Sequence, residues 1–138
     1  MNRRYDERAA ATIELVLLTP VLIVMLLFVV ALGRVASARQ DVDAAARDAA
    51  RAAANARSAS AASADGNTAA RAALGEGGVT CRTLAVDVRT SDFRADGFVT
   101  ASVSCTVDLG DLTGLHIPGS RSITSSFTVP IDQYRGVS

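Results

Sequence analysis

Residues 15–32 read LVLLTPVLIVMLLFVVAL and carry no charged side chain. Thr19 and Pro20 are the only interruptions of this apolar run. Together with Ile13, the run has about the ~20 residues that a helix needs to cross a bilayer. A soluble helix of that length would need a polar face, and this run has none. A proline is tolerated in a membrane helix, where it bends the helix. The sequence therefore predicts a transmembrane helix, with expected bounds at 10–33.

Composition excludes several classes of function. Fourteen Arg balance fourteen Asp and Glu in 138 residues, and there is no Lys. This neutral total argues against a nucleic-acid partner that is bound through bulk positive charge. Two Cys and one His are too few for the usual structural zinc sites. His116 has no convincing catalytic partner in the sequence. We therefore expect no enzyme, no metal, no cofactor and no small-molecule substrate.

Three explanations of the apolar run remain open. A basic start, with Arg3, Arg4 and Arg8, favours a cytoplasmic N-terminus in each of them. A cleaved secretory signal fits residues 36–38 (ASA), although the apolar core exceeds the roughly 7–15 residues expected. A plain signal anchor needs only the apolar run. The third explanation gives a function to Glu14, a carboxylate at the edge of the run, because ionisable groups in a membrane are costly. Otherwise Glu14 lies at headgroup level in water.

The N-terminal region resembles a known family. Residues 8–15 (RAAATIEL), the Leu-rich run with Pro20 and the closing residues 31–34 (ALGR) resemble TadE-like pseudopilins. These are minor components of tight-adherence (Flp-type) pili, within the wider type IV pilin family. The family has a short charged leader that a prepilin peptidase removes, and a Glu at the fifth mature position. The leader usually ends in Gly, and Phe or Tyr often follows the Glu.

The resemblance implies a processing site and an assembly residue. Residues 1–9 would be the leader, Ala9 its last residue and Ala10 the first mature residue, which makes Glu14 the fifth. Ala9 stands in place of the usual Gly, and Leu15 in place of Phe or Tyr. After cleavage, the Glu14 carboxylate would pair with the α-amine of a neighbouring subunit. Such a pair would set the axial register, because a buried charge without its partner is heavily penalised.

The resemblance also implies a structural role and a location. The chain would be a minor pseudopilin in the cytoplasmic membrane, with its N-terminus inside and its C-terminal domain outside, available for a surface pilus. Its partners would be the prepilin peptidase, other pilins, pilus assembly membrane proteins and the lipid bilayer. The alternative is a signal-anchored or secreted extracytoplasmic binding module that belongs to no pilus.

An Ala-rich segment follows the membrane run. Residues 34–57 lack Pro and are dominated by Ala, the best helix former, so they predict a helical stalk continuous with the membrane helix. Small apolar residues recur along it at helical spacing and would allow close helix–helix approach in an assembly: Val35, Val42, Ala46, Ala49 and Ala53. A solvated or partly frayed stalk is the alternative. Residues 58–77 predict a hinge, with a turn at 65–67 (DGN) and a short helix over 69–74.

Residues 78–138 predict a small β domain. Three segments alternate apolar residues with polar, mostly hydroxyl-bearing ones, as half-buried strands do. The apolar positions are Leu84, Val86 and Val88; Val99, Ala101, Val103, Cys105, Val107 and Leu109; and Ile123, Phe127, Val129 and Ile131. Residues 95–97 (ADG) suit a turn, and 110–119 a longer loop. We expect an α+β, pilin-like fold, in which a three-stranded antiparallel sheet packs its apolar face on the Ala-rich helix.

Cys81 and Cys105 fall near the first and second strands. We expect a disulfide between them, because small exported domains with thin cores often need one. Closing a loop of this length would contribute about 3 kcal/mol in the chain-entropy description. Two free thiols are the alternative. Cys81 is out of phase with the apolar positions of its strand, so it precedes the regular strand or lies at a bulge.

Overall fold

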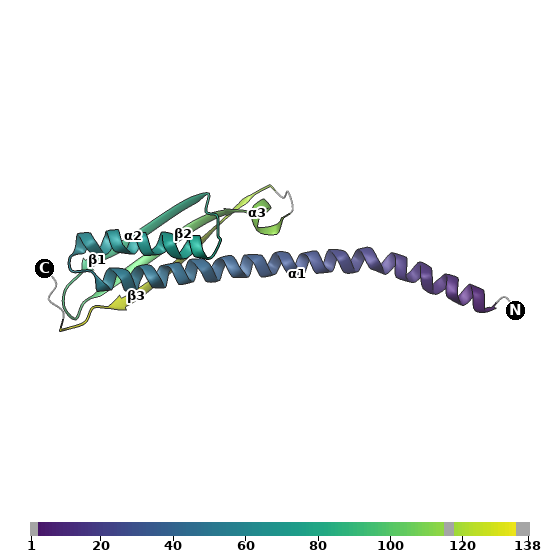
Figure 1. Cartoon of the computed structure of the whole chain (residues 1–138), viewed down its shortest axis with the longest axis horizontal. Helices are drawn as coiled ribbons and strands as arrows, with labels where there is room; N and C mark the ends of the chain where they lie inside the picture. Colours follow the sequence, from purple (N-terminus) through teal and green to yellow (C-terminus); the bar gives the residue numbers. More distant parts are fainter. Residues whose placement is uncertain (1–2, 115–117, 135–138) are drawn as a thin grey trace.

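The computed structural model describes residues 3–114 and 118–134. Its elements are α1 (Arg3–Asn55), α2 (Ala59–Glu76), β1 (Thr83–Asp92), β2 (Phe98–Asp108), α3 (Leu109–Thr113) and β3 (Ser120–Pro130). The 53 residues of α1 span about 80 Å at the usual rise per residue. The N-terminal half of α1 projects alone, whereas its C-terminal half lies along the rest of the chain (Figure 1). The expected α+β fold is confirmed.

The three strands form one antiparallel sheet in the order β1-β2-β3. In the central strand β2, buried and half-buried residues alternate from Val99 to Asp108, and the half-buried positions are polar. On that polar face, hydroxyl groups of Thr100 and Thr128 share a hydrogen bond of 2.8 Å between adjacent strands. The predicted alternation is therefore confirmed in β2, whereas in β3 the apolar Phe127 is exposed. The predicted turn is also present, with Asp96 at a φ of 63° and Gly97 where a Cβ would collide with the carbonyl oxygen of Asp92.

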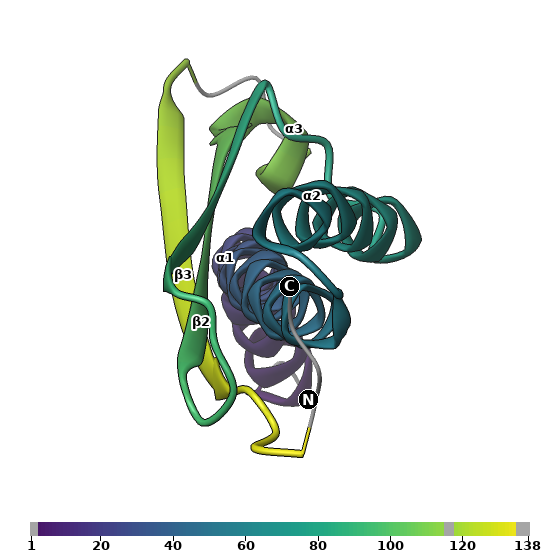
Figure 2. The same cartoon turned by 90° about the vertical axis from the view of Figure 1, so that its left-hand side faces the viewer.

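Helices α1 and α2 lie side by side on one face of the sheet (Figure 2). Helix α1 packs against β2 and β3, while α2 covers β1. The main core contains small residues of α1, Val42, Ala46 and Ala49 among them, together with apolar residues of β2. Since these side chains are fully buried, a solvated stalk is excluded for this part of α1. Ala rather than larger residues permits the helix to lie close to both neighbours.

The small-residue stripe of α1 therefore has a different partner from the expected one. Val42, Ala46, Ala49 and Ala53 are fully buried inside the chain's own domain. The expectation that they form a contact surface between subunits is wrong. The close helix approach that they allow is the approach of α2 to α1.

The predicted hinge is also wrong, because residues 59–76 form one 18-residue helix. Its N-cap is Ser58, whose hydroxyl accepts a hydrogen bond from the Ala61 N–H at 3.3 Å. Gly66, expected in a turn, lies in the middle of α2 and is buried there. It is needed for close packing, since a Cβ at this position would lie 3.2 Å from the Ala49 carbonyl oxygen.

Smaller differences concern the ends of elements. Helix α1 ends at Asn55, two residues before the expected end of the stalk. β2 ends at Asp108, and the predicted loop begins with the short helix α3. Gly114 closes α3 in the left-handed conformation and donates its N–H to the Gly110 carbonyl at 3.0 Å. The short helix thus follows from local capping, which strand periodicity does not report.

Candidate functional site

The apolar half of α1 packs against nothing in the described chain. From Leu15 to Leu32, its large apolar side chains are between 45% and 67% exposed. Each square ångström of such surface costs about 25 cal/mol in water, so a bare helix of this kind needs an apolar environment. Among the described residues, α1 is the one helix long and apolar enough to cross a membrane. This surface is the main candidate for function.

Pro20 is accommodated without ending the helix. A proline has no N–H, so the Val16 carbonyl four residues earlier lacks its normal helix partner. Next to it, the Thr19 hydroxyl donates a hydrogen bond to the Leu15 carbonyl at 2.7 Å. Helix α1 continues on both sides of Pro20 and is bent in its N-terminal part (Figure 1). Both properties fit a helix inside a membrane.

The predicted processing and assembly residues lie at the start of α1. Ala9, Ala10 and Glu14 are all within the helix, and Glu14 immediately precedes the apolar run. Residues 10 and 14 are four positions apart, so the helix places them on the same face, one turn from each other.

The geometry of α1 agrees with the comparison to known proteins. A family model described as TadE-like protein matches residues 9–51. Residues 9–51 of the chain are therefore TadE-like. The match begins at Ala9, contains Glu14 and the whole apolar run, and ends in the part of α1 that packs on the sheet. No curated protein and no solved structure matches the chain.

The family links the chain to tight-adherence pili. The TadE-like family is a structural family of these pili, so the match implies that the chain is a pilus-associated component. The matched residues include the bare helix and its first contacts with the domain, whereas α2 and the sheet lie outside the match. In a TadE-like protein, the bare apolar helix is the element expected to meet lipid and other pilus subunits.

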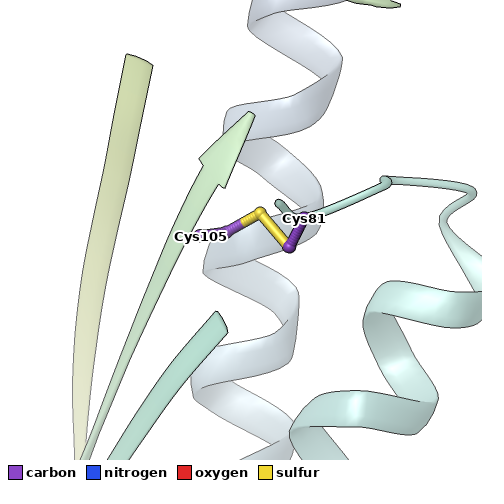
Figure 3. The surroundings of a disulfide bond; sticks show 2 residues. All are labelled: Cys81 and Cys105. Atoms are coloured by element: carbon purple, nitrogen blue, oxygen red, sulfur yellow. A yellow bond between two sulfur atoms is a disulfide. The ribbon is translucent and has the colours of Figure 1, made fainter. Parts of the chain in front are cut away.

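Cys81 and Cys105 form a disulfide, with their Cα atoms 5.3 Å apart. Cys81 precedes β1 by two residues, and Cys105 is a buried residue of the central strand. The bond lies beside α1 and ties the segment after α2 to the middle of the sheet (Figure 3). The expected pairing is confirmed, as is the expectation that Cys81 precedes the regular strand.

The remaining sequence features contribute no further site. His116 lies outside the described residues. Among the described residues, no group of three or more His, Cys, Asp or Glu side chains is placed to hold a metal ion. One hollow is lined by Arg34, Asp41 and Asp111, three residues to which the sequence alone assigns no role. No spacing in the sequence could have related them, because Asp111 lies far along the chain from the other two.

Proposed function

We propose that this TadE-like protein is a minor pseudopilin of a tight-adherence pilus. The observation that carries the proposal is the division of α1 into two parts. Residues 15–32 are bare and apolar, whereas residues 38–54 contribute buried side chains to the core of a folded domain. The TadE-like match runs across the junction between these two parts. Such a chain is held in the membrane by one helix and presents a domain at the membrane surface, ready to join a helical assembly.

The proposal includes orientation and processing. Arg3, Arg4 and Arg8 favour a cytoplasmic N-terminus, so the domain would face the other side. The disulfide supports this orientation, because such bonds form in oxidising compartments. Residues 1–9 would act as the leader, and a prepilin peptidase would cut between Ala9 and Ala10. Ala9 supplies the small side chain that the peptidase requires.

In the assembled pilus, Glu14 would set the register between subunits. Cleavage before Ala10 would create a positive α-amine one helical turn from the carboxylate. In an apolar bundle of helices, a Glu14 carboxylate that lacked a cationic partner would be destabilised by several kcal/mol. A subunit would therefore stop at the axial position where its carboxylate meets the α-amine of its neighbour.

The Glu14→Gln variant tests this role. It keeps the shape of the side chain and removes its charge, so membrane insertion should persist while pilus incorporation falls strongly. Glu76→Gln is the matched control, since Glu76 is an exposed carboxylate at the end of α2 and outside the matched family region. Cells that express either variant are fractionated, and the protein is quantified in membranes and in sheared pili. Normal incorporation of the Glu14→Gln variant would contradict the proposed role.

The alternative is an anchored or secreted binding module without a pilus. Cleavage after Ala38 would release the module, but α1 runs without a break through residues 36–38. Ala38 is also buried in the core, with 2% of its surface exposed. Cutting there would remove the first buried residue of the domain, which favours the pseudopilin over the secreted form.

A further inference from the structure

An open hollow of about 260 Å³ lies between α1, the segment that follows α2, and α3. We call it the membrane-proximal hollow, and its charged and hydroxyl-bearing lining residues are Arg34, Ser37, Asp41, Thr80 and Asp111. A guanidinium nitrogen of Arg34 reaches within 3.5 Å of the Cβ position of Gly114, so this side chain lies beside the end of α3. The Asp41 carboxyl group, two helical turns further along α1, lies against Gly77.

The hollow lies close to the end of the membrane helix. Arg34 follows the last residue of the apolar run, Leu32, by two positions, which is about 3 Å along the helix. Asp41 is nine positions beyond Leu32, or about 14 Å. Headgroups occupy roughly 5–8 Å on each side of the hydrocarbon core. Figure 1 shows α3 at the end of the domain that is nearer to the projecting part of α1. If residues 15–32 span the bilayer, Arg34 lies at the level of the headgroups, and the hollow extends from there to Asp41 on the aqueous side of them.

The charges that line the hollow are not neutralised by one another. Within residues 3–114 and 118–134, the Arg34, Asp41 and Asp111 side chains take part in none of the ion pairs or side-chain hydrogen bonds. Helix α1 thus offers a cation and a carboxylate, and α3 offers a second carboxylate in the same hollow. A ligand that carries one anionic and one ammonium group would satisfy both kinds of side chain.

We propose that the membrane-proximal hollow binds phosphoethanolamine, presented by the bilayer as the headgroup of phosphatidylethanolamine. The Arg34 guanidinium would donate hydrogen bonds to the phosphate oxygens, whose spacing matches its fork of N–H groups. The Asp41 and Asp111 carboxylates would accept hydrogen bonds from the primary ammonium. The hollow holds roughly nine water volumes of about 30 Å³ each, which is room for a headgroup of this size. The inference rests on the proposed membrane anchoring.

The chemistry predicts selectivity among lipids. Phosphatidylcholine carries a quaternary ammonium that has no N–H to donate, and phosphatidylglycerol has no ammonium group. Both keep the phosphate that Arg34 would bind. Retention of phosphatidylethanolamine should therefore exceed that of the other two by about tenfold, the effect of losing one charge-assisted hydrogen bond.

The test uses the full chain in nanodiscs that contain equal amounts of the three lipids with identical acyl chains. Lipids retained by the protein after release from the nanodisc are quantified by native mass spectrometry. Asp111→Asn removes a partner of the ammonium, so it should reduce phosphatidylethanolamine towards the level of the other lipids. Arg34→Gln removes the partner of the phosphate, so it should lower the retention of all three lipids. Both residues are exposed, so both variants should keep their unfolding temperature.

Matched controls come from a second hollow at the far end of the domain. Arg51 and Asp132 line it, so Arg51→Gln and Asp132→Asn make the same chemical changes away from the membrane. Neither control should alter lipid retention. Equal retention of the three lipids by the unaltered chain, unchanged selectivity in Asp111→Asn, or unchanged lipid retention in Arg34→Gln would overturn the inference.

Two further outcomes matter. One distinguishes a lipid from a soluble ligand, and the other tests whether the chain is anchored in a membrane at all. Soluble phosphoethanolamine should displace the retained lipid. If it binds the chain in phosphatidylcholine nanodiscs while phosphatidylethanolamine is not retained, the lipid assignment is overturned in favour of a soluble ligand. If the chain enters no nanodisc of any composition, the membrane anchoring itself fails, and the inference fails with it.

Discussion

Gly66 of α2 lies so close to Ala49 of α1 that a Cβ at Gly66 would be 3.2 Å from the Ala49 carbonyl oxygen. The same Cβ would be 2.9 Å from a methyl group of Val88 in β1. Three elements thus meet at one glycine, and two of them lie outside the segment that matches the TadE-like family. The contact fixes α2 against α1 and so helps to hold the sheet-bearing domain on the membrane helix.

The Gly66→Ala variant should destabilise the domain. The added methyl group gains up to about 1 kcal/mol of helix propensity, but overpacking at a tight contact costs about 1–3 kcal/mol. Thermal unfolding of the full chain in detergent measures the difference. Gly75→Ala is the control in the same helix, because nothing lies within 4 Å of its Cβ position. That variant should be stabilised instead. The prediction fails if both substitutions change the unfolding temperature in the same direction.

The buried stripe of α1 gives a second prediction. Substitutions in it distinguish a role in the core of the domain from a role in contacts between subunits. Ala49 is fully buried and Ala44 is exposed, five residues apart on the same helix. Ala49→Leu should lower the free energy of unfolding by about 1–3 kcal/mol through overpacking. Ala44→Leu should change it by less than about 0.5 kcal/mol. Denaturant titration of both variants makes the comparison. If Ala49→Leu reduced pilus incorporation and left stability unchanged, the stripe would be an intersubunit surface after all.

The cysteines can be tested as a pair that shares one bond. Cys81→Ala and Cys105→Ala should each lower stability by about 3 kcal/mol, since either removes the cross-link over 24 residues. The double variant should lose about as much as one single variant, because the second change has no bond left to break. Non-reducing mass spectrometry should find the two cysteine peptides joined. Losses that add in the double variant would show that the bond contributes little.

Much of the architecture follows from patterns that a sequence displays directly. The run from Leu15 to Leu32 predicts a membrane helix because no residue in it offers a polar face. The strand from Val99 to Val107 predicts one buried face because apolar residues occupy every second position. The out-of-phase position of Cys81 predicts that it precedes its strand or lies at a bulge, and it precedes the strand by two residues. In these cases, the local pattern and the tertiary environment favour the same conformation.

Helix α2 could be predicted only over residues 69–74, because in its first half tertiary contacts override the local preference. Residues 65–67 (DGN) are typical of a turn, yet Gly66 is helical since it is the residue small enough for the contact with α1. The membrane-proximal hollow was equally hidden, because Arg34 and Asp111 meet only when α3 returns to α1. For the candidate site, the position of Glu14 can be read from the sequence, but the proposed partner of its carboxylate would belong to a different subunit.

The start of the mature protein tests the central proposal most directly. The protein is recovered from cell membranes, and its N-terminal peptide is identified by mass spectrometry. Processing as a pseudopilin predicts a first residue at Ala10, with Glu14 as the fifth. A chain that still carries residues 1–9, or one that begins at Arg39, would contradict the account.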